Sequence, residues 1–218
     1  MKSLLLFIVS ILISFSSLAQ ADEIDFGIEI GLSKPKIISN IDIFDYTDAS
    51  FRPSISLYLM KNLNKNWSFE VGIGYLDYRF ENENNYVLVN PDGTFINLSG
   101  VKNFLLLTLP LKIKRHFNNN GLYYSVGLTN KILFDAYMYL QNTENNKKNQ
   151  RETIGAQYST YALAIDGEFG YEYSISSKMR LFTSFKCSTD LIDLDPIASK
   201  KDDYYVLVIP SVQIGCVF

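Results

Sequence analysis

The last fifteen residues of the chain, from Tyr204 to Phe218, alternate between the two faces of an extended strand. Because strand side chains point to opposite sides with a period of two, one face is apolar. It carries Tyr204, Val206, Val208, Pro210, Val212, Ile214, Cys216 and Phe218, and the other carries Ser211, Gln213 and Gly215. Such an alternation with a terminal aromatic residue is typical of the strand that closes an outer-membrane β-barrel. We therefore expect a C-terminal assembly signal formed by Val212, Ile214, Cys216 and Phe218.

The N-terminal segment predicts a Sec-type signal peptide over residues 1–21. Lys2 is basic, a mainly apolar segment runs from Leu4 to Phe15, and Ala19-Gln20-Ala21 is a small-x-small cleavage site. The apolar segment is too short to span a bilayer as a helix. Cleavage after Ala19 is the alternative to cleavage after Ala21. We expect residues 22–218 to form one outer-membrane β-barrel domain.

Composition excludes some classes of function. The chain has 20 Lys and Arg against 23 Asp and Glu, and removal of Lys2 with the signal peptide leaves a net charge of 19 − 23 = −4. An acidic chain without a basic stripe is a poor nucleic-acid binder, so we expect no nucleic-acid partner. No run of eighteen apolar residues follows the signal peptide, which excludes helical membrane spans. A closed barrel is the other structure that satisfies every backbone group in lipid.

Seven further segments alternate in the same way, so the sequence predicts eight strands. The segments are Asp25–Ser33, Ser50–Met60, Trp67–Tyr75, Lys102–Phe117, Leu122–Thr129, Tyr161–Tyr173 and Met179–Ser188. Short turns alternate strictly with long polar segments; the turns are 62–66, 118–121 and 174–178, and the long segments are 34–49, 81–100, 134–157 and 189–203. Outer-membrane barrels have short periplasmic turns and long external loops. The predicted fold class is all-β: an eight-stranded antiparallel up-and-down transmembrane β-barrel.

The polar face of these strands decides which side faces outward. It is rich in Gly, Ser and Ala and carries a predicted lumen charge network of both signs: Glu29, Arg52, Glu70, Lys112, Lys114, Asp166, Glu168, Glu172, Arg180 and Lys186. Small residues and mixed charges suit the narrow lumen of an eight-stranded barrel. The apolar face has no charge in any strand centre, where Lys or Arg in mid-bilayer would cost about 2–4 kcal/mol each. We therefore favour a membrane barrel over a lipocalin, whose apolar face points inward.

Aromatic residues gather where interfacial girdles should lie. Near the short turns we place Trp67, Phe69, Tyr171, Tyr173 and Phe218, and near the long loops Phe26, Phe51, Tyr75, Tyr161 and Tyr204.

Strand register and direction give two further predictions. If 174–178 is a turn, cross-strand partners have numbers summing to about 352, so that Glu172 faces Arg180 and Asp166 faces Lys186 inside the lumen. Cys187 and Cys216 lie on the lipid face near opposite ends of antiparallel strands. Their separation, on the order of 25 Å at 3.3 Å per residue, is too large for a disulfide, so we expect two free thiols.

Candidate catalytic and metal-binding residues are few. The sole histidine, His116, lies beside a periplasmic turn, whereas membrane-barrel enzymes usually place catalytic groups at the loop end. We interpret it as a solvated side chain at the rim instead of half of a Ser-His pair. Asp190, Asp193 and Asp195 have oxygen atoms suited to calcium but lack the spacing of a defined calcium loop. We expect no catalytic residue, no cofactor and no metal site.

A family resemblance rests on four segments. Leu105-Leu-Leu-Thr-Leu-Pro-Leu-Lys-Ile-Lys114, with the following turn and the strand Leu122–Leu128, resembles the PorT-like outer-membrane β-barrel domain family. Members of that family typically show aliphatic-x-aliphatic-Pro-Leu-x-x-Lys in this strand. Ala164–Tyr173 and Val212–Phe218 are similar to its later strands, although the terminal Gly-Cys-Val-Phe differs from the usual Gly-aromatic-basic-Phe. The resemblance covers the chain from about Ile24, and one branch of the family is linked to protein secretion across the outer membrane.

The predicted function is that of a small non-enzymatic protein of the bacterial outer membrane. Its long loops would contact an external partner or support the envelope. An accessory role in a secretion or transport machine is the alternative that the resemblance implies. An enzyme acting on lipid A and an open pore are two further alternatives; His116 argues against the first, and an interior filled by side chains against the second. The expected partners are outer-membrane lipid and lipopolysaccharide, the barrel assembly machinery and, in the alternative, secretion-machine proteins.

Overall fold

The computed structural model describes residues 24–39, 48–89, 95–117, 121–142, 150–157, 159–176, 179–192 and 205–218. The predicted signal peptide lies outside the described residues. Within them, no helix is long and apolar enough to cross a membrane.

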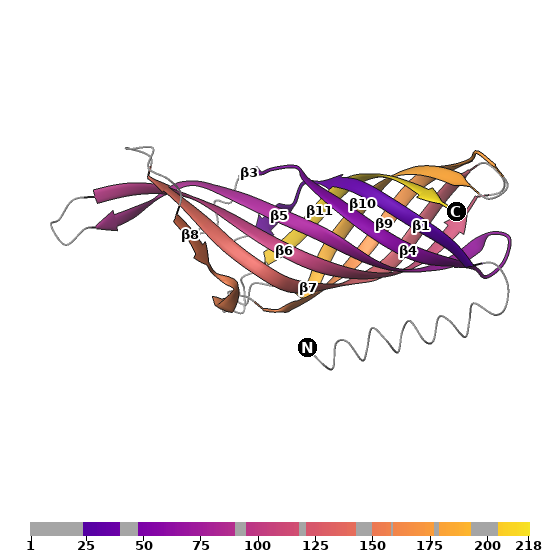
Figure 1. The fold of residues 1–218 in the computed structure, drawn as a ribbon, viewed down its shortest axis with the longest axis horizontal. Helices are drawn as coiled ribbons and strands as arrows, with labels where there is room; N and C mark the ends of the chain where they lie inside the picture. The colour runs from indigo at the N-terminus through magenta and orange to yellow at the C-terminus, as the bar shows by residue number, and fades with distance from the viewer. Residues whose placement is uncertain are drawn as a thin grey trace.

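Eight long strands form a closed antiparallel barrel (Figure 1). They are β1 (Ile24–Ser33), β4 (Arg52–Asn62), β5 (Trp67–Val89), β6 (Phe95–His116), β7 (Leu122–Asn142), β9 (Tyr161–Ser174), β10 (Arg180–Ile192) and β11 (Tyr205–Val217). Each pairs with the next along the chain, and β1 pairs with β11 to close the sheet. The predicted eight-stranded up-and-down barrel is confirmed.

Three short strands extend this barrel at the end away from the short turns. β2 (Lys36–Ser39) continues the line of β1 along β11. β3 (Asp48–Ala49) precedes β4 along β5, and β8 (Gln150–Thr153) precedes β9 along β7. A 3₁₀ turn, η1 (Gly155–Gln157), lies between β8 and β9. The long segments predicted as loops therefore contain pieces of the same sheet.

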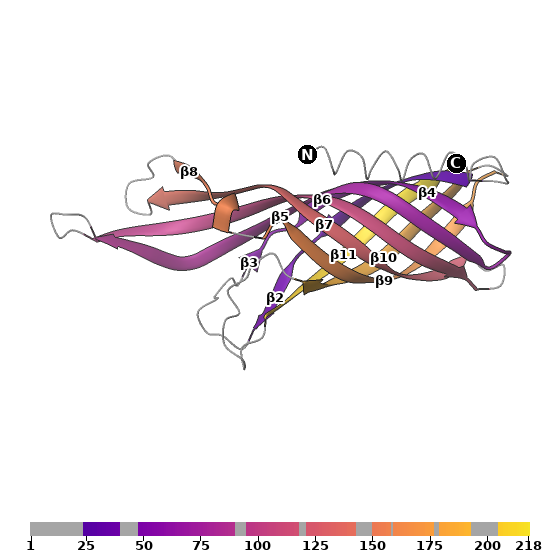
Figure 2. The same ribbon diagram turned by 90° about the horizontal axis from the view of Figure 1, so that it is seen from below.

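Strands β5, β6 and β7 are much longer than predicted, with 23, 22 and 21 residues. The segments 81–100 and 134–157, predicted as loops, are largely strand, so that part of the prediction is wrong. A tilted strand needs about 9–11 residues to cross a bilayer. The part of a strand beyond the lipid does not need an apolar outer face, so the sequence there lacks the alternation that identifies a strand. We call residues 77–89, 95–104 and 134–142 the external ribbon. Figures 1 and 2 show it projecting from one end of the barrel.

Burial follows the predicted alternation of faces. On β7, Ser125 and Thr129 are buried, whereas Val126 and Leu128 are exposed. The same holds along β9, where the buried residues are Ala162, Ala164, Asp166, Glu168 and Glu172 and the exposed ones Ile165, Phe169, Tyr171 and Tyr173. At these positions, charged and small side chains face inward and apolar side chains face outward.

The short turns and the chain's last residue meet at one end of the barrel. Leu63 N–H donates to the Trp67 carbonyl across the first turn at 2.8 Å. Phe26 and Phe218 exchange two backbone hydrogen bonds of 3.1 and 2.8 Å at the same end. The placement of Phe26 in the long-loop girdle is therefore wrong, because β1 begins at the periplasmic end and runs outward.

Three aromatic rings fill the periplasmic end of the lumen, each lying over a glycine of the neighbouring strand. The direct cross-strand pairs are Gly27–Tyr58, Gly170–Tyr123 and Gly215–Phe182. A Cβ atom on any of these glycines would lie between 2.1 and 2.5 Å from the facing ring. The rings pack with Met60 and Val217 into one buried cluster. The glycines provide the room that the rings need in so narrow a barrel.

This close approach predicts that Gly215→Ala destabilises the barrel by about 1–3 kcal/mol, because the added methyl group overlaps the Phe182 ring. Gly167→Ala is the matched control: Gly167 is also a strand glycine, but a Cβ there has nothing within 4 Å. We expect the control to stay within about 0.5 kcal/mol of the parent protein. The measurement is the urea midpoint of detergent-refolded protein. Equal midpoints for the two variants would show that the ring does not need the space.

Candidate functional site: the charged layer of the lumen

The lumen is divided into three layers. The periplasmic layer is the ring cluster just described, and the middle layer is charged. The layer at the loop end is an apolar core formed by Ala49, Tyr78, Phe80, Phe104, Leu106, Leu133, Ala136, Ile154, Ala162, Leu207 and Ile209. Sequence reasoning missed this third layer, because it treated every inward position as polar. The charged layer therefore lies between two apolar layers.

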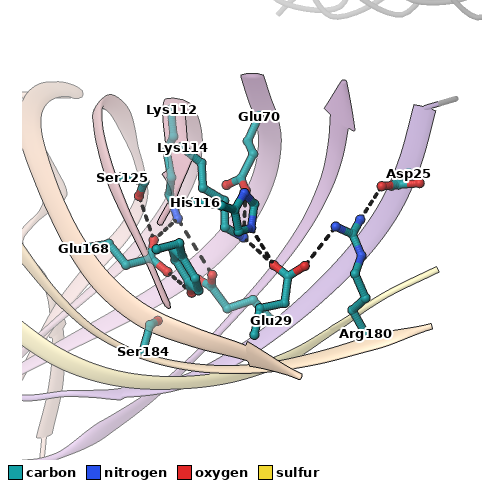
Figure 3. Close-up of polar contacts among 12 residues, drawn as sticks. Asp25, Glu29, Glu70, Lys112, Lys114, His116, Ser125, Glu168, Arg180 and Ser184 are labelled. Carbon is teal, nitrogen blue, oxygen red and sulfur yellow. Dashed lines mark hydrogen bonds and ion pairs between the residues drawn. The ribbon is translucent and has the colours of Figure 1, made fainter. Parts of the chain in front are cut away.

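Lys112 occupies the centre of the charged layer (Figure 3). Its Nζ lies 2.8 Å from Glu168 Oε2 and 3.7 Å from Glu29 Oε2. Glu168 also accepts hydrogen bonds from Tyr123 Oη at 2.8 Å and from Ser125 Oγ at 3.2 Å. Because β1 and β9 lie on opposite sides of β6 in the sheet order, Lys112 joins two separate parts of the barrel wall.

Lys114 forms the next step toward the periplasm. Its Nζ lies 3.3 Å from Glu70 Oε1 and 3.1 Å from Glu172 Oε2. The ammonium also lies 3.9 Å from the centroid of the Tyr123 ring and 5.4 Å from that of Phe182. A cation over aromatic faces gains electrostatic stabilisation. Lys114 thus links the charged layer to the ring cluster below it.

Glu172 contacts two cations and one imidazole at the periplasmic mouth. Besides Lys114 it binds Arg180, with Nη1 2.8 Å from Oε1, and His116, whose Nε2 lies 3.3 Å from Oε2. Arg180 also pairs with Asp25 of β1. His116 lies beside the periplasmic turn as predicted, but it is half-buried against Glu172 instead of being solvated.

Small residues on β7 allow β6 and β9 to interact across it. In the register of the sheet, Gly127 lies between Lys112 and Asp166, and Ser125 lies between Lys114 and Glu168. A Cβ atom on Gly127 would lie 2.9 Å from Lys112 Cγ. A larger side chain there would block the path of the lysine toward β9.

Both predicted ion pairs between β9 and β10 are present, although the predicted register is wrong by two residues. Partner numbers sum to 354: Glu172 lies opposite Phe182, and Asp166 lies opposite Ser188. The ion pairs form diagonally, with Lys186 Nζ 3.0 Å from Asp166 Oδ2. A shift of two residues keeps every side chain on its own face, so the long side chains still reach their partners.

Arg52 lies outside the charged layer. Its guanidinium is 3.4 Å from Asn103 Oδ1 and 3.8 Å from Asp77 Oδ2, near the external ribbon. The other nine residues of the predicted network lie in the lumen. Asp25 and His116 join them, although the sequence analysis did not include these two in the network.

Sequence reasoning also missed a buried ion pair between Lys131 and Asp190. Continuing the inward positions Ser125 and Thr129 by one step of the alternation predicts that Lys131 faces inward. Continuing the inward positions Lys186 and Ser188 by one step predicts the same for Asp190. The predicted strands ended too early to include either residue. Of the three aspartates with oxygen atoms suited to calcium, Asp190 pairs with Lys131, and Asp193 and Asp195 lie outside the described residues. Among the described residues no three His, Cys, Asp or Glu side chains are arranged to hold a metal ion.

Three of the four proposed C-terminal assembly residues lie on the outer face of β11, and Phe218 directly follows the strand. Val212, Ile214 and Phe218 are exposed, whereas Cys216 is only 9% exposed. Cys187 and Cys216 are free thiols, as predicted. Cys187 pairs with Pro210 in the sheet, six positions along β11 from Cys216.

A cavity of about 50 Å³ lies beside the charged layer. Its lining includes Glu29, Glu70, Lys112, Lys131 and Lys186, together with Ser54, Ser56, Thr108, Ser188 and Gln213. Polar cavities of this size have room for a few water molecules.

The model of a family described as "Outer membrane protein beta-barrel domain" matches residues 18–195. The chain belongs to this family. It is an outer-membrane β-barrel protein, so the predicted location is confirmed, and the apolar face is the lipid-facing one, unlike that of a lipocalin. No curated protein sequence matches the chain.

Solved outer-membrane barrels are similar in fold. Neisserial surface protein A shares 9% identity at a TM-score of 0.43, covering 90% of this chain and 98% of that one. Ail, the attachment invasion locus protein of Yersinia pestis, shares 12% at 0.44, covering 90% and 100%. The N-terminal barrel domain of Pseudomonas aeruginosa OprF shares 11% at 0.36, covering 88% and 97%. All three TM-scores are below 0.5. The family match and the closed barrel, and not these three structures, identify the chain as an outer-membrane β-barrel protein.

The pair between Asp166 and Lys186 predicts a charge-exchange rescue. Lys186→Glu places a carboxylate beside Asp166 and beside Glu168, which is the cross-strand partner of position 186. We expect this change to lower the free energy of unfolding by about 3–5 kcal/mol. Adding Asp166→Lys should restore much of that loss. Lys36→Glu is the control, because Lys36 is exposed and has no ion pair with a described residue. The readout is the urea midpoint, and additive losses in the double variant would rule out the contact.

Proposed function

We propose that the protein is a non-enzymatic, non-conducting outer-membrane barrel that presents the external ribbon to a macromolecular partner outside the cell. The observation that carries the proposal is strand length. β5 has 23 residues where about 9–11 are enough to cross the bilayer, so more than half of it lies beyond the lipid. The parts of the three strands beyond the lipid are not needed to cross the bilayer.

The base of the external ribbon is a packed structure. Tyr78, Phe80 and Phe104 of the ribbon are buried in the apolar core at the loop end of the lumen. Ring contacts connect them, with centroids 6.4 Å apart for Tyr78 and Phe80 and 6.0 Å apart for Phe80 and Phe104. Because rigid elements hold a binding surface more precisely than loops do, this core suits a display role.

The filled lumen supports a non-conducting barrel. An eight-stranded barrel has an interior just wide enough for side chains, and here two apolar layers enclose the charged one. His116 is bound to Glu172 at the periplasmic end, which supports a non-enzymatic role.

An accessory role in protein secretion is the second candidate. It rests on the resemblance of Leu105–Lys114 and of the later strands to the PorT-like family, one branch of which is linked to secretion. Such a role requires protein contacts at the periplasmic end as well. A cleft lined by Asn64, Lys65, His116 and Arg180 opens among the short turns there and would be available for such contacts.

Photo-crosslinking in intact cells tests the display proposal. A photoreactive residue at Val101, within the ribbon, should give protein adducts, whereas one at the lipid-facing Val126 should give none. Replacing residues 83–99 by Asn-Gly joins the cross-strand partners Asn82 and Gly100 and removes only the outer part of the ribbon. This variant should keep the urea midpoint and lose the adducts.

Val101 adducts that match those of Val126 would contradict the display proposal. Protein adducts from a photoreactive residue at Asn64, in a periplasmic turn, would favour the secretion candidate instead.

A further inference from the structure

One arginine and three aromatic rings form a cluster at the short-turn end of the outer surface. Trp67 begins β5 and is the cross-strand partner of Arg115 on β6, which in turn is the partner of Tyr124 on β7. The guanidinium lies 5.2 Å from the centroid of the Trp67 ring, and its Nη1 donates to Tyr124 Oη at 3.5 Å. The Tyr124 ring lies 6.4 Å from the Trp67 ring and 5.3 Å from that of Phe117.

The strand pattern places this cluster at the level of the lipid headgroups. Arg115 alternates with the inward-facing Lys114, so its side chain lies on the lipid side of β6. It follows the outward apolar positions that run from Leu105 to Ile113, a length close to one membrane crossing. Because the short turns are periplasmic, the guanidinium lies at the periplasmic boundary of the hydrocarbon layer.

Within the described part of the chain, no carboxylate pairs with the cations at this site. Arg115 has no carboxylate partner among the described residues, and the same is true of Lys61, which lies outward on β4, and of Lys65 in the adjacent turn. Of the described side-chain carboxylates at this end, Asp25 and Glu172 are bound to Arg180, and Glu70 is bound to Lys114. Three cations without a carboxylate partner among the described residues, all on one side of the barrel, favour an anionic ligand.

We propose that Arg115, Trp67 and Tyr124 bind the phosphodiester of an anionic phospholipid in the periplasmic leaflet. Guanidinium offers paired N–H donors to phosphate oxygen atoms, and a planar group held over an indole is already oriented to use them. The cluster continues the lipid-facing apolar surface, so a ligand with acyl chains gains apolar contact that a soluble phosphate does not. Lys61 and Lys65 favour a headgroup with net negative charge over a zwitterionic one.

The chain has a single tryptophan, which reports on the site directly. The protein is reconstituted in mixtures of brominated and unbrominated lipid, and quenching of Trp67 fluorescence gives the relative affinity for phosphatidylglycerol over phosphatidylcholine. We expect a preference of about tenfold, in line with one charge-assisted contact. Arg115→Gln should reduce the preference to the smaller part that Lys61 and Lys65 support, and Arg115→Lys should leave more of it because the charge remains without the planar group. Lys36→Gln, at an exposed cation near the loop end, should leave it unchanged.

Heat-dependent gel mobility checks that each variant is folded. Arg115→Lys gives a second measurement of the lipid preference at this site if Arg115→Gln does not fold. Soluble glycerol phosphate at millimolar concentration should leave the preference intact. Its abolition by glycerol phosphate would assign the site to free phosphate and overturn the lipid assignment. An Arg115→Gln barrel with the full preference would overturn the site itself.

Discussion

The structure depends on the neutralisation of charge inside a narrow barrel. Lys112 is buried between Glu29 and Glu168, which come from separate parts of the wall, and each of the three side chains is no more than 7% exposed. A buried charge without its partner is strongly destabilising. The lumen can therefore contain these groups only if the strands close with β1, β6 and β9 at the right heights.

The other features of the barrel follow from the same lack of space. Gly127 lets Lys112 reach past β7, and glycines opposite Tyr58, Tyr123 and Phe182 leave room for the ring layer. The apolar core at the loop end completes the filling and extends into the external ribbon. Because the lumen is filled in this way, we propose that the ribbon outside and the rim facing the periplasm are the parts that contact other molecules.

Period-two alternation was enough to predict the eight strands, their lumen and lipid faces and both ion pairs between β9 and β10. It could not show whether the residue numbers of cross-strand partners sum to 352 or to 354, because a shift of two residues leaves every side chain on the same face. It also ended strands too early. Lys131 and Asp190 lie one step beyond the predicted ends, and residues 81–89 lie beyond the lipid, where alternation is not required. The contacts between Lys112 and Glu168 cross an intervening strand, and no pattern within one strand predicts them.

A double-mutant cycle between Lys112 and Glu168 tests the central claim most directly. The urea-unfolding free energies of Lys112→Met, Glu168→Gln and the double variant give the interaction energy of the pair. A cycle between the exposed Lys36 and Glu168 serves as the reference. We expect about 1.5–3 kcal/mol of coupling for Lys112 with Glu168 and none for the reference. Additivity within about 0.5 kcal/mol for Lys112 and Glu168 would contradict the claim that charge pairing across the lumen holds the barrel in this arrangement.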